Sequence, residues 1–327
     1  MSDSWRNGKQ VTGISTGYYK LDDLTCGLQK SDLIVIAGRH GMGKTAFALS
    51  MAKNIAVDLH KPMVYFSLQY PALRFANRLI SNLCMIEGKK IRDGQMDRDE
   101  RGRFDKVITS LRTMDTPLYI DDTPSLSVSE LRTKARKLVR KNHIELIMID
   151  YLQLMTTDGM RFECRKEEVS AIICSLKGLA KELNLPIIVL CQLYRTIRNE
   201  VKRPLLSDLR EIGAIEQDAD MVLFVHRPEY YHIYQDENGR DLRGMAQIII
   251  AKHRKGATGD VLLNFRGEFT RFENPEDSQL GRSKKQDMGG EIRGSKVNGN
   301  NQPPIDDEND PFSHLQMPPP EDGSAPF

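Results

Sequence analysis

One eight-residue stretch limits the fold of this chain more than any other. Residues 38 to 45 read GRHGMGKT, directly after the apolar run LIVIA and directly before a segment with helical periodicity. The stretch matches the pattern G-x-x-x-x-G-K-[ST], a phosphate-binding loop between a strand and a helix. Glycines let backbone N–H groups turn toward phosphates, the lysine adds a positive charge, and the hydroxyl can bind Mg²⁺. We therefore expect ATP and Mg²⁺ to be held by Gly38, Gly41, Gly43, Lys44 and Thr45.

The remainder of the chain up to residue 272 alternates short apolar runs with helical patterns. Such alternation is typical of an α/β fold, and near-continuously apolar strands are typical of a sheet covered on both faces. We predict a mostly parallel, twisted sheet with helices on both faces. We also expect an antiparallel edge, because only the short turn GATG separates the last two strands. The expected strands span 33–37, 63–68, 118–121, 145–149, 187–191, 221–225, 246–251 and 260–265. The expected helices span 44–60, 71–85, 97–113, 127–142 and 166–184.

Composition divides the chain into three parts. Residues 1–12 form an N-terminal extension, 13–272 hold the expected strands and helices, and 273–327 are rich in Pro, Gly, Asn, Asp and Ser. The last part carries 11 acidic and 5 basic residues, whereas the rest carries 34 acidic and 42 basic ones. We expect the tail to be disordered because it has little apolar surface to bury. No apolar run approaches the roughly 20 residues that span a bilayer, and no secretory signal is visible, so we expect a cytoplasmic protein without a membrane span.

Two polar residues at strand ends complete the expected nucleotide site. Asp150 closes the run ELIMI, where an acid could hold the water shell of Mg²⁺, although aspartate at a strand end is also a common turn former. Gln69 follows the run MVYFSL, which we expect to lie beside the strand that precedes the phosphate loop. A glutamine there can orient an attacking water, but it cannot accept a proton as a carboxylate could. The residues therefore predict nucleotide binding and leave hydrolysis open.

Six longer stretches carry a family signature. They are STGYYKLDDLTCGLQKSDLIVIAGRHGMGKTAFAL (15–49), FSLQYP (66–71), LIMIDYLQLM (146–155), SLKGLAKELNLPIIVLCQLYR (175–195), RPLLSDLREIGAIEQDADMVLFVHRPEYY (203–231) and AQIIIAKHRKGATGDVLLNF (246–265). Together they resemble the C-terminal ATPase domain of the DnaB-type hexameric replicative DNA helicases, which has a RecA-like fold. The resemblance covers roughly residues 11–272, and its most specific part is SDLREIGAIEQDAD followed by an AKHRKG loop.

The resemblance implies roles for residues outside the phosphate loop. Gln192 looks like the glutamine that senses the γ-phosphate and signals to the DNA-facing loops. Lys252 and Arg254 resemble a Lys-x-Arg pair that reaches across a subunit interface, with the arginine as a finger. The active site would then be shared between subunits, so the resemblance implies a homo-oligomer, expected to be a hexamer.

A second group of residues is expected to contact single-stranded DNA. The resemblance places Arg210, Glu211 and Gly213 in the central-channel loop that grips the strand backbone. Independently of the family, the stretch before them, RTIRNEVKRP, is basic and loop-like, and it suits either phosphate contact or an ordinary solvated surface. Its cations are Arg195, Arg198, Lys202 and Arg203.

The resemblance implies an ATP-hydrolysing DNA helicase that translocates on single-stranded DNA as a ring. Two features depart from the family pattern: Gln69 stands where the family has a presumed catalytic glutamate, and we expect the family's N-terminal collar and linker helix to be absent. These departures favour an alternative, an ATP-gated DNA-binding or helicase-regulating factor with weak or no hydrolysis. A RecA/RadA-type recombinase would share the phosphate loop, but the SDLREIG and AKHRKG stretches argue against it.

The tail contains two short acidic stretches that end in Pro-Phe. They are DDENDPF (306–312) and the final EDGSAPF. Both resemble the C-terminal tip of bacterial single-strand-binding proteins, although acidic, proline-rich composition is also common in disordered tails. The resemblance makes other replication proteins candidate partners of the tail.

Overall fold

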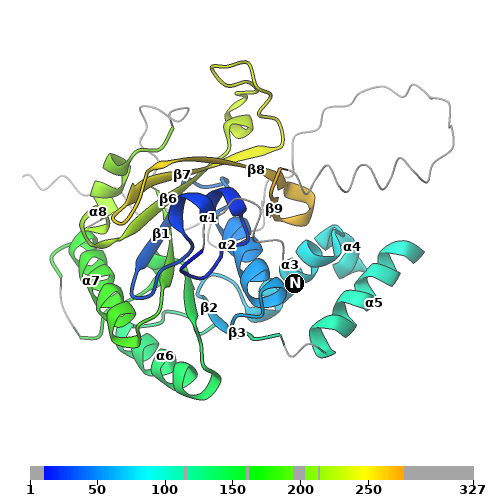
Figure 1. Ribbon diagram of the computed structural model, residues 1–327. Coiled ribbons are helices and arrows are strands. Elements are labelled where there is room, and N and C mark those ends of the chain that lie inside the picture. The colour runs from blue at the N-terminus through cyan, green and yellow to red at the C-terminus, as the bar shows by residue number, and fades with distance from the viewer. Residues whose placement is uncertain (1–10, 114–115, 160–161, 194–202, 213, 276–327) are drawn as a thin grey trace, which may run out of the picture. The chain divides into compact units, whose positions relative to one another are not determined.

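A mixed nine-stranded sheet runs through the part of the chain that the computed structural model describes (Figure 1). This part comprises residues 11–113, 116–159, 162–193, 203–212 and 214–275, with only the backbone described at Arg210 and Glu211. The strands lie in the order β3-β2-β4-β5-β1-β6-β7-β8-β9. Their bounds are Leu33–Gly38 (β1), Met63–Ser67 (β2), Leu118–Asp121 (β3), Leu146–Asp150 (β4), Ile187–Gln192 (β5), Met221–His226 (β6), Met245–His253 (β7), Gly259–Arg266 (β8) and Arg271–Glu273 (β9).

Strand direction divides the sheet into two regions. Six neighbouring strands pair in parallel, in the lateral order β3-β2-β4-β5-β1-β6, whereas β7, β8 and β9 add an antiparallel edge. Strands β1, β2, β4 and β6 are buried along their whole length, as strands covered on both faces should be. The predicted α/β class, the mostly parallel sheet and the antiparallel edge are confirmed.

Helices cover both faces of the sheet. The larger helices are α1 (Tyr19–Thr25), α2 (Lys44–Lys53), α3 (Ala72–Cys84), α5 (Arg98–Thr113), α6 (Val128–Asn142) and α7 (Arg165–Leu183). Side chains of α6 and α7 pack into one core, and those of α1, α2 and α3 pack into a second core on the other face. Short helical segments include α4 (Gly88–Asp93), η3 (Leu206–Ile212) and α8 (Ile215–Asp218), and η3 and α8 both contact α7. A core on each face makes the sheet a rigid platform for the residues at its edges.

Helix α6 shows how local sequence sets an element boundary. The Ser127 hydroxyl accepts a hydrogen bond from the Glu130 N–H at 3.3 Å, which satisfies one of the free N–H groups of the first turn. Apolar residues at helical spacing, Leu131 and Ala135, are buried against the sheet. The helix ends at Asn142 and is capped by His143, whose φ of 52° is the left-handed conformation common at helix C-termini.

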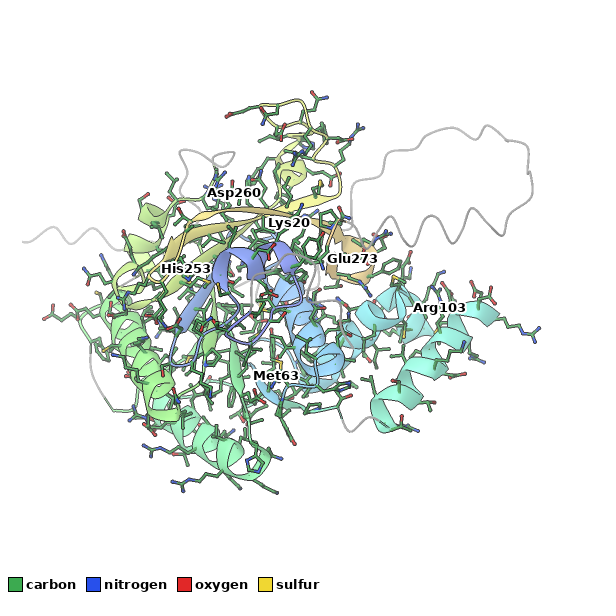
Figure 2. All side chains as sticks on the ribbon, viewed as in Figure 1. Lys20, Met63, Arg103, His253, Asp260 and Glu273 are labelled. Carbon is green, nitrogen blue, oxygen red and sulfur yellow. The ribbon has the colours of Figure 1, made fainter. Side chains whose placement is uncertain are left out.

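Two expectations about elements were wrong in detail. The strand before Gln69, β2, does not lie beside β1, because β4 and β5 stand between them. Apolar runs indicate strands but not their lateral order, so the sequence pattern could not exclude this arrangement. The expected helix 44–60 ends at Lys53 and continues as a π-helical segment, Asn54–Asp58. Beyond the expected strands the structure has β9, which ends at Glu273, labelled in Figure 2. The Glu273 carboxylate pairs with both Arg266 and Arg271.

Two parts of the expected domain organisation cannot be compared with the structure. Residues 1–10 of the expected extension and 276–327 of the expected tail lie outside the described residues. In the part of the chain that the structure describes, none of the helices has both the length and the apolar character needed to cross a bilayer.

Candidate functional site

The carboxyl ends of four parallel strands meet at one edge of the sheet. Gly38 pairs with Gln192 in the register of β1 and β5, and Ser67 pairs with Asp150 in the register of β2 and β4. The Leu68 N–H continues the second ladder by donating to the Asp150 carbonyl at 2.8 Å. The fold therefore places the phosphate loop, Asp150, Gln192 and the segment leading to Gln69 along the same edge.

The loop after β1 has the backbone of a phosphate cradle. Gly41 and Gly43 have φ values of 76° and 87°, a left-handed region that L side chains adopt at a cost of roughly 1–2 kcal/mol. A Cβ added to Gly38 would lie 2.8 Å from the Val225 carbonyl oxygen, so this position has no room for a side chain. Helix α2 begins immediately at Lys44, so its free N–H groups face the loop.

Lys44 lies inside this loop, where its charge is poorly hydrated. Its Nζ donates a hydrogen bond to the Arg39 carbonyl oxygen at 3.0 Å. Burial lowers the pKa of Lys44 to about 8, although the nearby Asp150 carboxylate opposes the shift. A largely dehydrated ammonium, whose charge Asp150 only partly compensates, is well suited to bind an anionic ligand.

Asp150 is a buried carboxylate surrounded by hydroxyl groups. The Tyr65 hydroxyl donates to its Oδ2 at 2.8 Å, and Asp150 also forms a hydrogen bond with Thr45. Burial raises the pKa of Asp150, while these hydrogen bonds and the charges of Lys44 and Arg78 oppose the rise. A carboxylate beside the Thr45 hydroxyl provides the hard oxygen donors that Mg²⁺ prefers.

Gln192 is fixed by a second glutamine that the sequence did not single out. The Gln153 amide donates to the Gln192 carbonyl oxygen at 2.7 Å and accepts from the Gln192 N–H at 3.2 Å. The Gln153 amide thereby makes, at the end of β5, the two backbone hydrogen bonds that a neighbouring strand would otherwise make. The only sequence signal for this contact was the position of Gln153 in DYLQLM, three residues after Asp150.

Lys252 and Arg254 lie toward the end of the sheet at which β1 begins, opposite the end that carries the phosphate loop. Lys252 pairs with Val222, and Val222 pairs with Val35. Lys252 is therefore at the level of Val35, three residues before Gly38 along β1. At a strand rise of 3.3 Å per residue this is about 10 Å. The Lys252 ammonium donates to the Gln217 carbonyl at 3.2 Å, and burial together with Arg254 lowers its pKa.

Arg254 is still farther from the phosphate loop of its own chain. Its N–H donates to the Asp220 carbonyl, and the Asp220 N–H donates to the carbonyl of Leu33 at the start of β1. The Arg254 guanidinium contacts the Asp220 carboxylate at 3.2 Å and the Gln217 carbonyl. These contacts hold the side chain away from the edge that carries Lys44.

The expected DNA-contacting residues are only partly described. Arg210 and Glu211 lie on η3, and nothing is described of their side chains. Arg203 forms a two-pronged ion pair with Asp260 of β8, with one contact of 2.6 Å. The remaining four, Arg195, Arg198, Lys202 and Gly213, lie outside the described residues.

The fold and the phosphate loop define a P-loop domain of the RecA-like class. The family model of the DnaB-like helicase C terminal domain matches residues 13–274, and the chain belongs to this family. "Replicative DNA helicase DnaB" of Pasteurella multocida is 46% identical over 267 residues, which are 81% of this chain and 56% of that protein. "Probable replicative DNA helicase" of Trieres chinensis is 43% identical over 271 residues, 82% of this chain and 59% of that protein.

A solved structure agrees with this assignment. It is described as "The Structure Of A DnaB-Like Replicative Helicase And Its Interactions With Primase". It is 34% identical, has a TM-score of 0.74, and the match covers 82% of this chain and 63% of that chain. The family expected from the sequence is therefore confirmed. The chain spans between 56 and 59% of the length of the two curated relatives above.

Proposed function

We propose that this domain binds Mg–ATP and hydrolyses it to move along single-stranded DNA, as the motor domain of a replicative-type helicase. The observation that carries the proposal is the sheet edge at which Lys44, Thr45 and Asp150 meet. Membership of the DnaB-like helicase C-terminal domain family supports the same activity. The domain would act in the cytoplasm.

The residues at this edge fit the chemistry of phosphoryl transfer. Mg²⁺, when bound, neutralises charge on the β- and γ-phosphates. Thr45 and Asp150 would hold the ion, and Lys44 would bind the phosphate oxygens. Gln69, which is exposed just beyond β2, would orient the attacking water, while Gln192 would contact the γ-phosphate.

Residues of a neighbouring subunit would complete the site. Lys252 and Arg254 lie too far from the phosphate loop of their own chain to contact bound nucleotide there. A ring in which one subunit offers this edge to the next would place both cations on the neighbour's nucleotide, where an arginine finger stabilises transition-state charge. We therefore propose a homo-oligomer, with a hexamer as the expected form.

DNA would be held by the segment between β5 and α8. Arg210, Glu211 and Gly213 would contact the strand backbone, aided by Arg195, Arg198 and Lys202. Arg203 would have to leave Asp260 to join them, so it is the least suited of the basic residues. The acidic Pro-Phe stretches of the tail would bind other replication proteins.

ATP turnover with and without single-stranded DNA tests the proposal. We expect DNA-stimulated turnover by the native chain and a loss of about 100-fold or more in Lys44→Ala, since a positioned charge at the phosphates contributes at least this much. Gln69→Glu separates the proposal from the alternative of an ATP-gated DNA-binding factor. If the native chain is no faster than Lys44→Ala while Gln69→Glu gains activity, the motor proposal fails and the alternative holds.

A further inference from the structure

Helix α6 carries an unusual concentration of positive charge. Among its 15 residues, VSELRTKARKLVRKN, six are Lys or Arg and one is acidic. Leu131 and Ala135 are buried, and Leu138 and Val139 pack partly buried against the same core, so the basic residues lie on the remaining surface of the helix. The helix leads into the amino end of β4, and its basic end therefore lies away from the sheet edge that carries Lys44.

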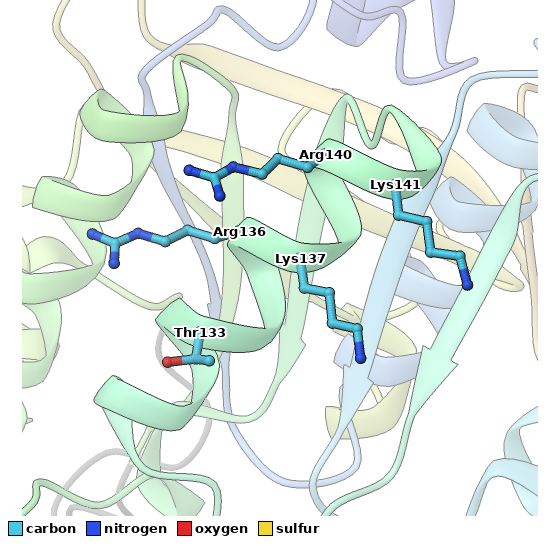
Figure 3. Close-up of a pocket in the computed structure, with 5 residues that line it drawn as sticks. All are labelled: Thr133, Arg136, Lys137, Arg140 and Lys141. Atoms are coloured by element: carbon cyan, nitrogen blue, oxygen red, sulfur yellow. The ribbon is translucent and has the colours of Figure 1, made fainter.

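Half of these charges are neutralised within the domain, and half are not. Arg132 and Arg136 pair with Glu182 of α7, and Lys134 pairs with Asp121 and Glu130. The structure shows no acidic partner, among the residues it describes, for Lys137, Arg140 or Lys141. These three residues, with Thr133 and Arg136, line a shallow hollow of about 490 Å³ on the exposed side of α6 (Figure 3).

The arrangement of the cations offers little to the stability of the domain. Arg136 and Arg140 point to one side of the helix, and Lys137 and Lys141 point to the other (Figure 3). Lys137 and Lys141 form a like-charge i,i+4 pair, which costs about 0.2–0.5 kcal/mol in a helix. In the other row the charge of Arg136 is offset by Glu182, and only Arg140 has no acidic partner among the described residues. The helix dipole favours cations only within the last turn, which includes Arg140 and Lys141 but not Arg136 or Lys137. A bound anion would offset the repulsion among these cations.

We infer that the exposed side of α6 binds the sugar-phosphate backbone of DNA through residues other than those expected to line the central channel. Its hollow is lined by cations and one threonine, with no aromatic or aliphatic side chain that could anchor a protein partner. Lysine is depleted in protein interfaces, whereas Lys and Arg that neutralise phosphates dominate DNA binding. The hollow also has no aromatic ring on which bases could stack, so the inferred contact is with phosphates and is independent of sequence.

Salt-dependent binding of labelled DNA tests this inference. A triple variant, Lys137→Ala/Arg140→Ala/Lys141→Ala, removes the unpaired cations while keeping good helix formers. The matched control, Arg101→Ala/Arg103→Ala/Lys106→Ala, removes the same charge from α5, where Arg103 is labelled in Figure 2. Fluorescence anisotropy with a 20-nucleotide dT strand and a 20-base-pair duplex gives the slope of log K against log salt concentration. Thermal unfolding checks that both variants are folded.

We expect the α6 variant to lose about tenfold or more in affinity at low salt and to flatten the slope by about 0.7 per lost contact on the single strand, or about 0.9 on the duplex. The α5 control should match the native chain.

Equal losses in the two variants would mean a non-specific effect of net charge and would overturn the inference, as would unchanged binding by the α6 variant. Loss of binding to polyglutamate with DNA binding intact would instead assign the surface to an acidic protein. ATP turnover without DNA should stay at the native level, so this test is separate from that of the proposed motor function.

Discussion

The Tyr65 hydroxyl donates a 2.8 Å hydrogen bond to Oδ2 of Asp150, and both side chains are buried. Tyr65 lies in the middle of β2 and Asp150 at the end of the adjacent β4. Burial and the charge of Asp150 raise the pKa of Tyr65 well above 10, so the phenol remains a donor at neutral pH. The carboxylate proposed to hold Mg²⁺ is therefore oriented by a side chain from the neighbouring strand.

Tyr65→Phe should lower the free energy of unfolding by about 1.5–3 kcal/mol, because a hydrogen bond to a buried charged group is lost. Urea unfolding in the absence of nucleotide measures this. Tyr119→Phe on β3 provides the control, since the structure shows no hydrogen bond from that hydroxyl to any residue it describes, and its effect should stay within about 0.5 kcal/mol. Equal effects of the two substitutions would contradict the orienting role of Tyr65.

Asp220 should make an acid-sensitive contribution to stability. Burial alone would raise the pKa of its carboxyl, but hydrogen bonds from Lys177 and from the Leu33 N–H, with the charges of Lys177 and Arg254, outweigh burial and hold the pKa below 3.8. The stabilisation is therefore complete above the ordinary pKa and is lost as pH falls through the lowered native value.

Asp220→Asn should accordingly cost about 2 kcal/mol at pH 7, the size of a hydrogen bond to a charged group. The difference in unfolding free energy between the native chain and this variant should shrink as pH falls below 3.8. Urea unfolding across pH 3 to 7 measures the difference. A difference that does not change over this range would show that the ion pairs with Lys177 and Arg254 contribute nothing.

A shared active site predicts that two inactive variants restore each other. Lys44→Ala and Arg254→Ala should each abolish most turnover alone. In a random mixture, about a quarter of the interfaces join an intact Lys44 to an intact Arg254, so turnover should recover to about a quarter of the native value. No recovery in mixed oligomers, verified by size-exclusion chromatography, would place Arg254 outside the active site.

Much of the fold and the centre of the site could be predicted because their determinants are local. The phosphate loop is one continuous stretch. The buried strands of the parallel region appear in the sequence as apolar runs, whose bounds agree with those of the strands to within one or two residues. Asp150 could be placed at a strand end for the same reason. Family resemblance then supplied roles for Gln192, Lys252 and Arg254 that no local pattern contains.

The features that sequence reasoning missed depend on contacts between distant segments. Tyr65 looked like an ordinary core residue, because an apolar strand pattern does not show which neighbour its hydroxyl meets. Gln153 acquires its role only when β4 and β5 pair. The order of β2, β4, β5 and β1 was also beyond the pattern, since crossover helices of similar length can lead to adjacent or to distant strands.

The most direct test of the account is calorimetric titration of the native chain with ATP, with and without Mg²⁺. We predict one nucleotide per chain, binding that strengthens with Mg²⁺, a loss of at least about tenfold in affinity for Lys44→Ala, and loss of the Mg²⁺ effect for Asp150→Asn. Native affinity in Lys44→Ala, or an undiminished Mg²⁺ effect in Asp150→Asn, would contradict the assignment of this sheet edge as a Mg–ATP site.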